Sequence, residues 1–169
     1  NSMVGKIPIL GDVIVGDFTS ITRIRATDGG TVWSMPRQRA VSGNCGPAVG
    51  PTGVYIDELV PGGQRIVKLD LATGSTLYAS TPMGGFTEQN APFVSPDGTR
   101  VYFSRTQNNT SVDFLFAFQE TGSALTQLWS RPVRWTTSHE HGIAAAGSIY
   151  TFTQADEFEH LVYALVRHT

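Results

Sequence analysis

The stretch from Lys68 to Ser80, KLDLATGSTLYAS, contains two alternating segments joined by a Thr-Gly turn. Alternation of apolar and polar residues is typical of paired β-strands that bury one face. The glycine after Thr73 supplies the positive φ that a tight turn of this kind needs. The stretch therefore predicts a β-hairpin.

Related hairpins recur along the chain, as RIRATDGGTVWS (23–34), LFAFQETGSALTQLWS (115–130) and a shortened VYALVRHT (162–169). The three complete copies end in an aromatic residue, which we expect to pack between neighbouring units. These aromatic residues are Trp33, Tyr78 and Trp129. A further strand precedes each hairpin, and these strands begin at Val13, Val54, Val101 and Ile149, at intervals of 41, 47 and 48 residues.

One step further back, each unit has a short strand of small residues ended by a turn, such as Pro-Thr-Gly or Pro-Asp-Gly. Each unit thus contains four antiparallel strands in about 45 residues, the repeat of a β-propeller blade. The sequence predicts an all-β chain of four-stranded antiparallel blades in a single domain, 1–169. The expected blades are 5–37, 46–83, 91–133 and 142–169, and the last lacks its outer strand.

The hairpin LDLATGSTLY resembles the repeat of the quinoprotein-like propellers, the pyrroloquinoline-quinone-like repeat, and FVSPDGTRVYFS is similar to repeats of YVTN and TolB-type propellers. The residues that match the first motif are Asp70, Thr73, Gly74 and Tyr78. Cofactor-using members of the family have a calcium and quinone site, but no matching ligand set is found in this sequence. The resemblance therefore implies the fold and an extracytoplasmic location, without the quinone.

The incomplete fourth unit leaves the completion of the ring open. We expect the chain to be the C-terminal part of a larger propeller, whose missing blades or a protein partner cover its ends. One alternative is a compact four-bladed ring closed by NSMVGKIP, and another is two chains that associate as half-rings.

Composition limits the classes of function. The net charge is −2 and the sequence has no run of Lys or Arg, which argues against a nucleic-acid partner. Cys45 is the single cysteine, so the chain has no internal disulfide and no cysteine-based metal site. No apolar stretch approaches the roughly 20 residues of a membrane span.

The links between successive blades are expected to meet at one mouth of the propeller channel, where binding sites on loops usually lie. These links are 35–46, 81–90 and 131–142. The candidate ligand-binding residues on them are Arg39, Asn44, Glu88, Asn90, Arg134, Trp135, His139 and His141.

His139 and His141 point to the same side of an extended segment, so that the pair could hold a divalent metal ion with Glu88 or Glu140 as an oxygen ligand. The spacing is common, and histidines that are hydrated or hydrogen-bonded in a loop are the competing interpretation. No nucleophile in the sequence is paired with a base in a known catalytic motif. The sequence therefore favours a non-enzymatic scaffold or a binding domain for a ligand or protein. The alternative is a fragment of a propeller enzyme, either a quinoprotein dehydrogenase or a metal-assisted lyase or hydrolase that uses the mouth loops.

Overall fold

A computed structural model of the chain describes residues 3–6, 11–17, 19–37, 47–89, 92–108, 112–133, 143–145, 148–154 and 163–168. All secondary structure in these residues is β-strand, as the alternating sequence predicts. None of these residues belongs to a helix that is long and apolar enough to cross a bilayer.

The strands form four antiparallel sheets. The first sheet contains β1 (Met3–Lys6), β2 (Val13–Gly16), β3 (Ser20–Ile24) and β4 (Thr31–Pro36). The second contains β5 (Ala48–Gly50), β6 (Gly53–Val60), β7 (Gly63–Leu69) and β8 (Thr76–Ala79). The third contains β9 (Phe86–Gln89), β10 (Phe93–Val94), β11 (Arg100–Gln107), β12 (Asp113–Glu120) and β13 (Leu125–Val133). The fourth contains β14 (Ile143–Ala145), β15 (Ser148–Gln154) and β16 (Tyr163–His168).

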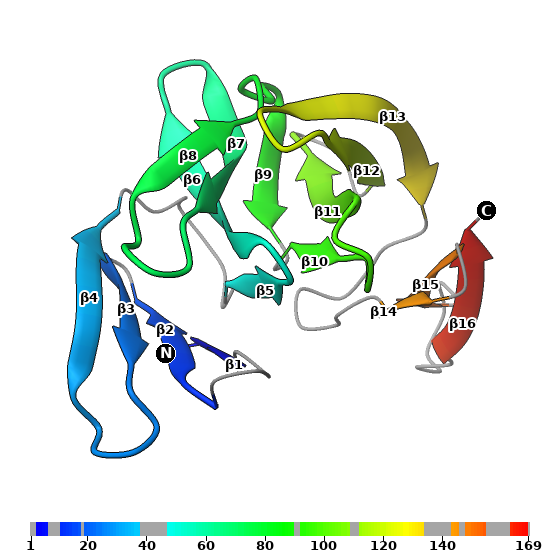
Figure 1. Cartoon of the computed structure of the whole chain (residues 1–169). Helices are drawn as coiled ribbons and strands as arrows, with labels where there is room; N and C mark the ends of the chain where they lie inside the picture. The colour runs from blue at the N-terminus through cyan, green and yellow to red at the C-terminus, as the bar shows by residue number, and fades with distance from the viewer. Residues whose placement is uncertain are drawn as a thin grey trace.

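The four sheets follow one another along an arc (Figure 1). The inner strands β1, β5, β10 and β14 are neighbours along the inside of this arc, while β4, β8, β13 and β16 lie on its outside (Figure 1). Apart from β9, which pairs with β11, successive strands pair within each sheet, so each sheet is a meander from the inside to the outside. We call the end of the sheets at the β6–β7 turn (61–62) the upper end, and the end at the β7–β8 turn (70–75) the lower end.

The third sheet differs from the expected pattern at its inner edge. We expected residues 81–90 to be a link, but residues 86–89 form β9, which pairs with the end of β11 from Arg105 to Gln107. A β-bulge between Arg105 and Thr106 allows β9 and β10 to pair with different parts of the same strand. The upper half of β11 therefore pairs with an additional strand. The sequence TPMGGFTEQN did not predict this strand, because its composition is typical of a turn.

Two apolar clusters hold the first three sheets together. Between the first and second sheets, Ile14, Ile21 and Trp33 pack against Val54 and Ile56. The second cluster lies between the second and third sheets, and its members are Tyr55, Ile66, Met83, Val101, Phe103, Phe116, Phe118 and Leu125. Each strand of the second sheet thus sends alternate side chains to opposite neighbours, because side chains alternate across a strand. The sequence of such a strand is apolar on both faces.

The outer strands β4, β8 and β13 each have a β-bulge beside their aromatic residue. The register with the neighbouring strand shifts so that Val32, Leu77 and Leu128 are the extra residues. All three are exposed, and Leu77 and Leu128 retain 47% of their accessible surface. A bulge changes the direction of the next side chain, which here turns Trp33 and Tyr78 toward the neighbouring sheet. The predicted packing of these two aromatic residues between units is confirmed.

Aspartate side chains close several of the turns. Asp70 Oδ1 accepts hydrogen bonds from Ala72 N–H at 3.0 Å, Thr73 N–H at 2.8 Å and the Thr73 hydroxyl at 2.9 Å. Asp17 and Asp97 make similar contacts within their own turns, the former at the upper end and the latter at the lower end. These contacts stabilise the ionised carboxylate and lower the pKa of all three side chains. They also explain why Asp and Thr precede the turn glycine in the hairpin motif.

Candidate functional site

The candidate channel-mouth residues named from the sequence lie almost entirely outside the described residues, so they stay predictions. Those outside are Arg39, Asn44, Asn90, Arg134, Trp135, His139, Glu140 and His141. Glu88 lies in β9, where the structure describes the backbone alone. Within the described part of the chain, no three His, Cys, Asp or Glu side chains are grouped so that they could hold a metal ion.

A buried ion pair lies at the upper end, next to the first link. Arg37 follows β4, and its Nη2 donates to the Asp57 carbonyl oxygen at 3.0 Å and to Asp57 Oδ1 at 3.2 Å. The two side chains are only 2% and 1% exposed. Gly16 leaves the space for the guanidinium, because a Cβ at this position would lie 3.3 Å from Arg37 Nη1. The ion pair therefore attaches the residue that follows β4 to strand β6 of the second sheet.

Two further buried polar residues lie at the boundary between the second and third sheets. Arg105 follows Phe103 by two positions on β11, and Gln64 precedes Ile66 by two positions on β7. Because Phe103 and Ile66 both belong to the core between the second and third sheets, alternation places Arg105 and Gln64 on that same side. Asp57 follows Tyr55 in the same way. We call the four buried residues Arg37, Asp57, Gln64 and Arg105 the upper polar cluster.

The upper polar cluster contains two guanidinium groups and one carboxylate. Charges are not buried at this depth unless they are paired or hydrogen-bonded, because desolvation is costly. Such groups hold their surroundings in one geometry. Within the cluster, Arg37 is the residue from which the chain continues into the link 38–46, and its bonds to Asp57 hold this end of the first sheet.

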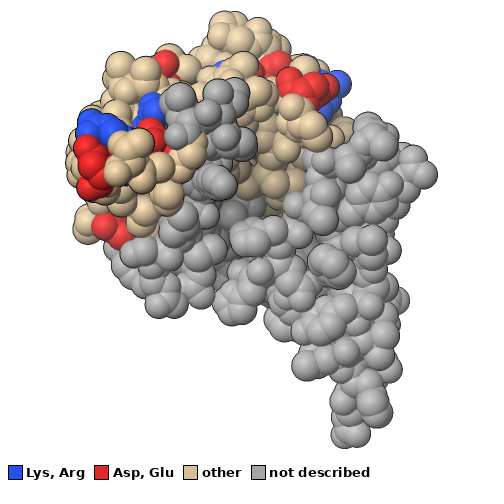
Figure 2. Space-filling view, turned by 60° about the horizontal axis from the view of Figure 1, so that its bottom comes forward, with Lys and Arg blue, Asp and Glu red and all other residues tan. Residues whose placement is uncertain are grey.

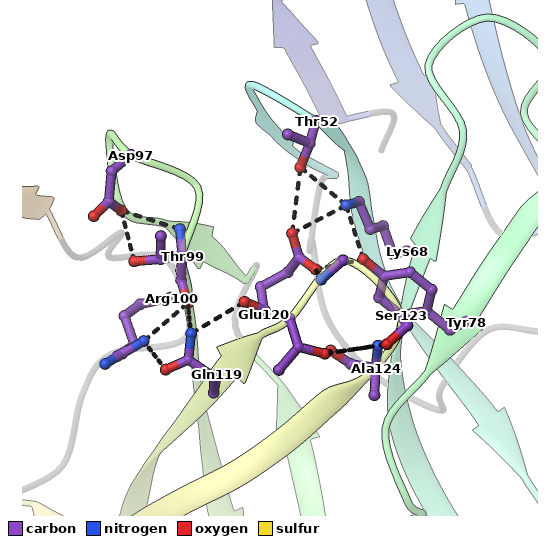
Figure 3. Close-up of polar contacts among 12 residues, drawn as sticks. Thr52, Lys68, Tyr78, Asp97, Thr99, Arg100, Gln119, Glu120, Ser123 and Ala124 are labelled. Carbon is purple, nitrogen blue, oxygen red and sulfur yellow. Dashed lines mark hydrogen bonds and ion pairs between the residues drawn. The ribbon is translucent and has the colours of Figure 1, made fainter.

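At the lower end, Lys68 lies inside a second polar group that joins the second and third sheets (Figure 3). Its ammonium group donates to Thr52 Oγ1 at 2.9 Å, Tyr78 Oη at 2.9 Å and Glu120 Oε2 at 3.1 Å. The Tyr78 hydroxyl donates to Glu120 Oε1. The ammonium also lies 5.7 Å from the ring centroid of Tyr55 and 5.2 Å from that of Tyr78. We call Thr52, Lys68, Tyr78 and Glu120 the lower clamp.

The electrostatics of the lower clamp favour an ionised carboxylate. Burial alone would raise the pKa of Glu120, but hydrogen bonds from Tyr78, the Gly122 N–H and Lys68 outweigh it and lower the pKa. Burial, together with the hydrogen bond to the Glu120 carboxylate, raises the pKa of Tyr78. Tyr78 is thus held as a neutral donor beside the carboxylate. Because the side chains of Lys68 and Glu120 are only 4% and 6% exposed, this group serves to join the sheets.

The first and second sheets are joined in a related way. Trp33 Nε1–H and Arg23 Nη1–H both donate to the Leu71 carbonyl oxygen, at 3.0 Å and 2.7 Å. Arg23 pairs with Trp33 across its strands as Lys68 pairs with Tyr78. Among the described residues, two sheets therefore use a cation and an aromatic residue to hold the lower end of the following sheet.

Sequence reasoning missed both buried groups. The available signal was a charged residue inside an otherwise apolar strand, as Asp57 is in VYIDEL, Lys68 in VKLDL and Arg105 in VYFSR. Charged residues are seldom fully buried unless they are paired, so each of them indicated a partner on a neighbouring sheet. On the face shown in Figure 2, the charged residues lie in small separate groups, several of which contain both signs.

The comparisons with known proteins concern the fold. No family model and no curated protein matches the sequence. Among solved structures, hydrazine synthase of Kuenenia stuttgartiensis matches 92% of this chain and 45% of its own, with a TM-score of 0.64 and 10% identity. TolB of Acinetobacter baumannii matches 99% of this chain and 40% of its own, with a TM-score of 0.64 and 13% identity. Prolyl oligopeptidase B of Galerina marginata matches 92% of this chain and 25% of its own, with a TM-score of 0.56 and 10% identity.

The chain thus spans less than half the length of each of these proteins. At such low identity the likeness concerns the fold alone, since one fold carries many functions. The described residues form four antiparallel sheets along an arc, and the chain matches these solved structures over nearly its whole length. This confirms the fold expected from the repeat: the chain is a partial β-propeller, and the described part of its fourth sheet has three strands.

Proposed function

We propose that this chain is a non-enzymatic propeller scaffold that binds a ligand or a protein at its upper face, as part of a larger propeller ring. The observation that carries the proposal is the upper polar cluster. Buried charges at the boundary between sheets hold the strand ends from which the first link departs, at Arg37. Binding residues on loops work best when such a rigid frame supports them.

The chemistry of the upper face suits recognition of polar groups. The links carry Arg39, Arg134, His139 and His141 beside Asn44 and Asn90, residues that donate hydrogen bonds to carboxylates and carbonyl groups. Trp135 adds an aromatic surface of the kind that is enriched where proteins bind one another. The proposal places the partner on these links, and the lower clamp at the opposite end has a purely structural role.

Photocross-linking from two positions tests this assignment. Thr81 is exposed and adjoins the upper end, and Ser123 is exposed in a turn at the lower end. A photoreactive amino acid replaces each residue in turn, in cells that make the protein. We expect a defined cross-linked product from position 81 and none from position 123. Equal products from both positions, or a product from position 123 alone, would contradict binding at the upper face.

The enzymatic alternative is tested with the same purified protein. Metal content and the visible absorption spectrum report a bound metal ion or quinone. We expect neither group at a stoichiometric level. Two results together would show that the protein is an enzyme. The purified protein would contain a stoichiometric metal ion and turn over a substrate, and His139→Ala or His141→Ala would abolish both the metal binding and the turnover. The resemblance to extracytoplasmic propellers supports a location outside the cytoplasm, which fractionation of the producing cells would test.

A further inference from the structure

The turn between β11 and β12, residues 108–112, carries a sequence motif that the proposed function does not use. It begins Asn-Asn-Thr-Ser, so both Asn108 and Asn109 are followed two residues later by a hydroxyl residue. Asn-x-Ser/Thr, with any residue except proline in the middle, is the acceptor motif of N-linked glycosylation. Asn44 and Asn90 have glycine and proline at the same distance, so they do not match. The motif therefore occurs at a single turn of the sequence.

Asn108 lies where an attached sugar would have room. It is exposed, and it directly follows β11 at the upper end of the third sheet. Next to it, Gln107 N–H donates to the Val112 carbonyl oxygen at 2.9 Å and closes the hairpin. Acceptor asparagines belong to surface loops, and Asn108 meets this condition. Residues 109–111 lie outside the described residues, so the structural argument rests on Asn108.

The backbone of Asn108 is held in place, whereas its side chain is not used by the fold. Its N–H donates to the Gly85 carbonyl oxygen at 2.9 Å. In other turns of the chain, the side chains of Asp70 and Asp97 accept hydrogen bonds from their own turn residues. Among the described residues, none forms such a bond with the side-chain amide of Asn108. Asn108 therefore does not owe its place to the hydrogen bonding that favours asparagine in turns.

We propose that Asn108 is an N-glycosylation site, which receives an oligosaccharide from a polyprenyl pyrophosphate donor. The side-chain nitrogen of Asn108 forms a bond to C1 of the first sugar and loses a proton. At the same time the bond between C1 and the pyrophosphate oxygen breaks, and the polyprenyl pyrophosphate leaves. Such transfer is made to secreted proteins, in agreement with the location that the resemblance supports. The inference does not depend on the proposed scaffold or on its partner.

Mass spectrometry of the chain isolated from the cells that make it tests the proposal. Peptide N-glycosidase F removes an N-linked oligosaccharide and converts its asparagine to aspartate, so in heavy-oxygen water the modified position acquires a label. We expect the label at position 108, and a chain mass that falls to that of the polypeptide after the enzyme treatment. A sample kept in the same water without the enzyme measures spontaneous deamidation. A mature chain without the label at position 108 would overturn the proposal.

Two substitutions within the motif separate Asn108 from Asn109. Thr110→Ala removes the motif of Asn108 and keeps that of Asn109, whereas Ser111→Ala does the reverse. We expect the label at position 108 to persist in Ser111→Ala and to disappear in Thr110→Ala, while circular dichroism shows that both variants are folded. A label at position 109 alone in the unaltered chain, or a label at position 108 that persists in Thr110→Ala, would contradict the assignment. Cross-linking at position 81 is read independently of these results.

Discussion

Gly74 offers a direct test of how the first two sheets pack. Its φ is +74°, and a Cβ would lie 2.6 Å and 2.7 Å from the Cε3 and Cδ2 atoms of Trp33. Gly74→Ala therefore has two costs. The left-handed backbone costs about 1–2 kcal/mol for a residue with a side chain. Overpacking against a buried ring adds about 1–3 kcal/mol, because the ring is held by a hydrogen bond to the Leu71 carbonyl.

Gly29→Ala separates the two costs. Gly29 has a φ of +73° in the equivalent turn, but a Cβ there meets no atom within 4 Å. This variant should lose only the backbone contribution, so urea denaturation should show Gly74→Ala to be less stable than Gly29→Ala by about 1–3 kcal/mol. Gly122→Ala, with a φ of +84° and no neighbour within 4 Å, is a second control. Equal losses at positions 29 and 74 would refute the close contact between Gly74 and Trp33.

Three further predictions concern charged and titrating groups. Lys68→Met leaves the buried Glu120 carboxylate without its cation, so denaturant titrations should show a free energy of unfolding lower by about 3–5 kcal/mol. The double variant with Glu120→Gln should lose less free energy of unfolding than the sum of the two single variants. Asp17 and Asp97 have a pKa of about 2 in the folded chain, against 3.8 in the unfolded chain, so their stabilisation is complete above pH 3.8 and is lost as the pH falls toward 2. The urea midpoint should fall in that interval, and less steeply in an Asp17→Asn, Asp97→Asn variant. The raised pKa of Tyr78 predicts that Tyr78→Phe reduces the fraction of tyrosine that ionises late in an alkaline absorbance titration.

Much of the fold follows from the sequence because the repeat is local. In the hairpin of Lys68–Ser80, the residues Asp70, Thr73 and Gly74 predict the turn. The structure explains each of them, since Asp70 accepts hydrogen bonds from Thr73 and Gly74 has a positive φ. Residues 86–89 were misplaced because Gly84 and Gly85 look like a link. Their pairing with β11 depends on a strand that is distant in the sequence. Alternation alone cannot report such a long-range pairing.

The sequence does contain a signal for the outer-strand bulges, but an analysis that looks only for strict alternation overlooks it. Val32 and Trp33, Leu77 and Tyr78, and Leu128 and Trp129 are adjacent apolar pairs in strands that should alternate. A pair of this kind cannot place both side chains on one face of a regular strand. The bulge resolves the conflict, since it leaves the aliphatic residue exposed and turns the aromatic residue inward. The same reading predicts a bulge wherever such a pair ends a hairpin of this repeat.

The partners of the buried cations were not predictable in the same way, because they depend on the length of the turn that receives them. In the second sheet, the turn closes from Asp70 N–H to Ser75 O, and its Leu71 carbonyl accepts the bonds from Arg23 and Trp33. In the third sheet, a shorter turn closes from Thr121 N–H to Ala124 O. There the acceptor is the carboxylate of Glu120, and a lysine replaces the arginine. A backbone carbonyl of Leu71 and a carboxylate of Glu120 thus accept the cation at equivalent positions of the two sheets. The strand register determines the position of the cation, and the turn of the neighbouring sheet determines which acceptor it binds.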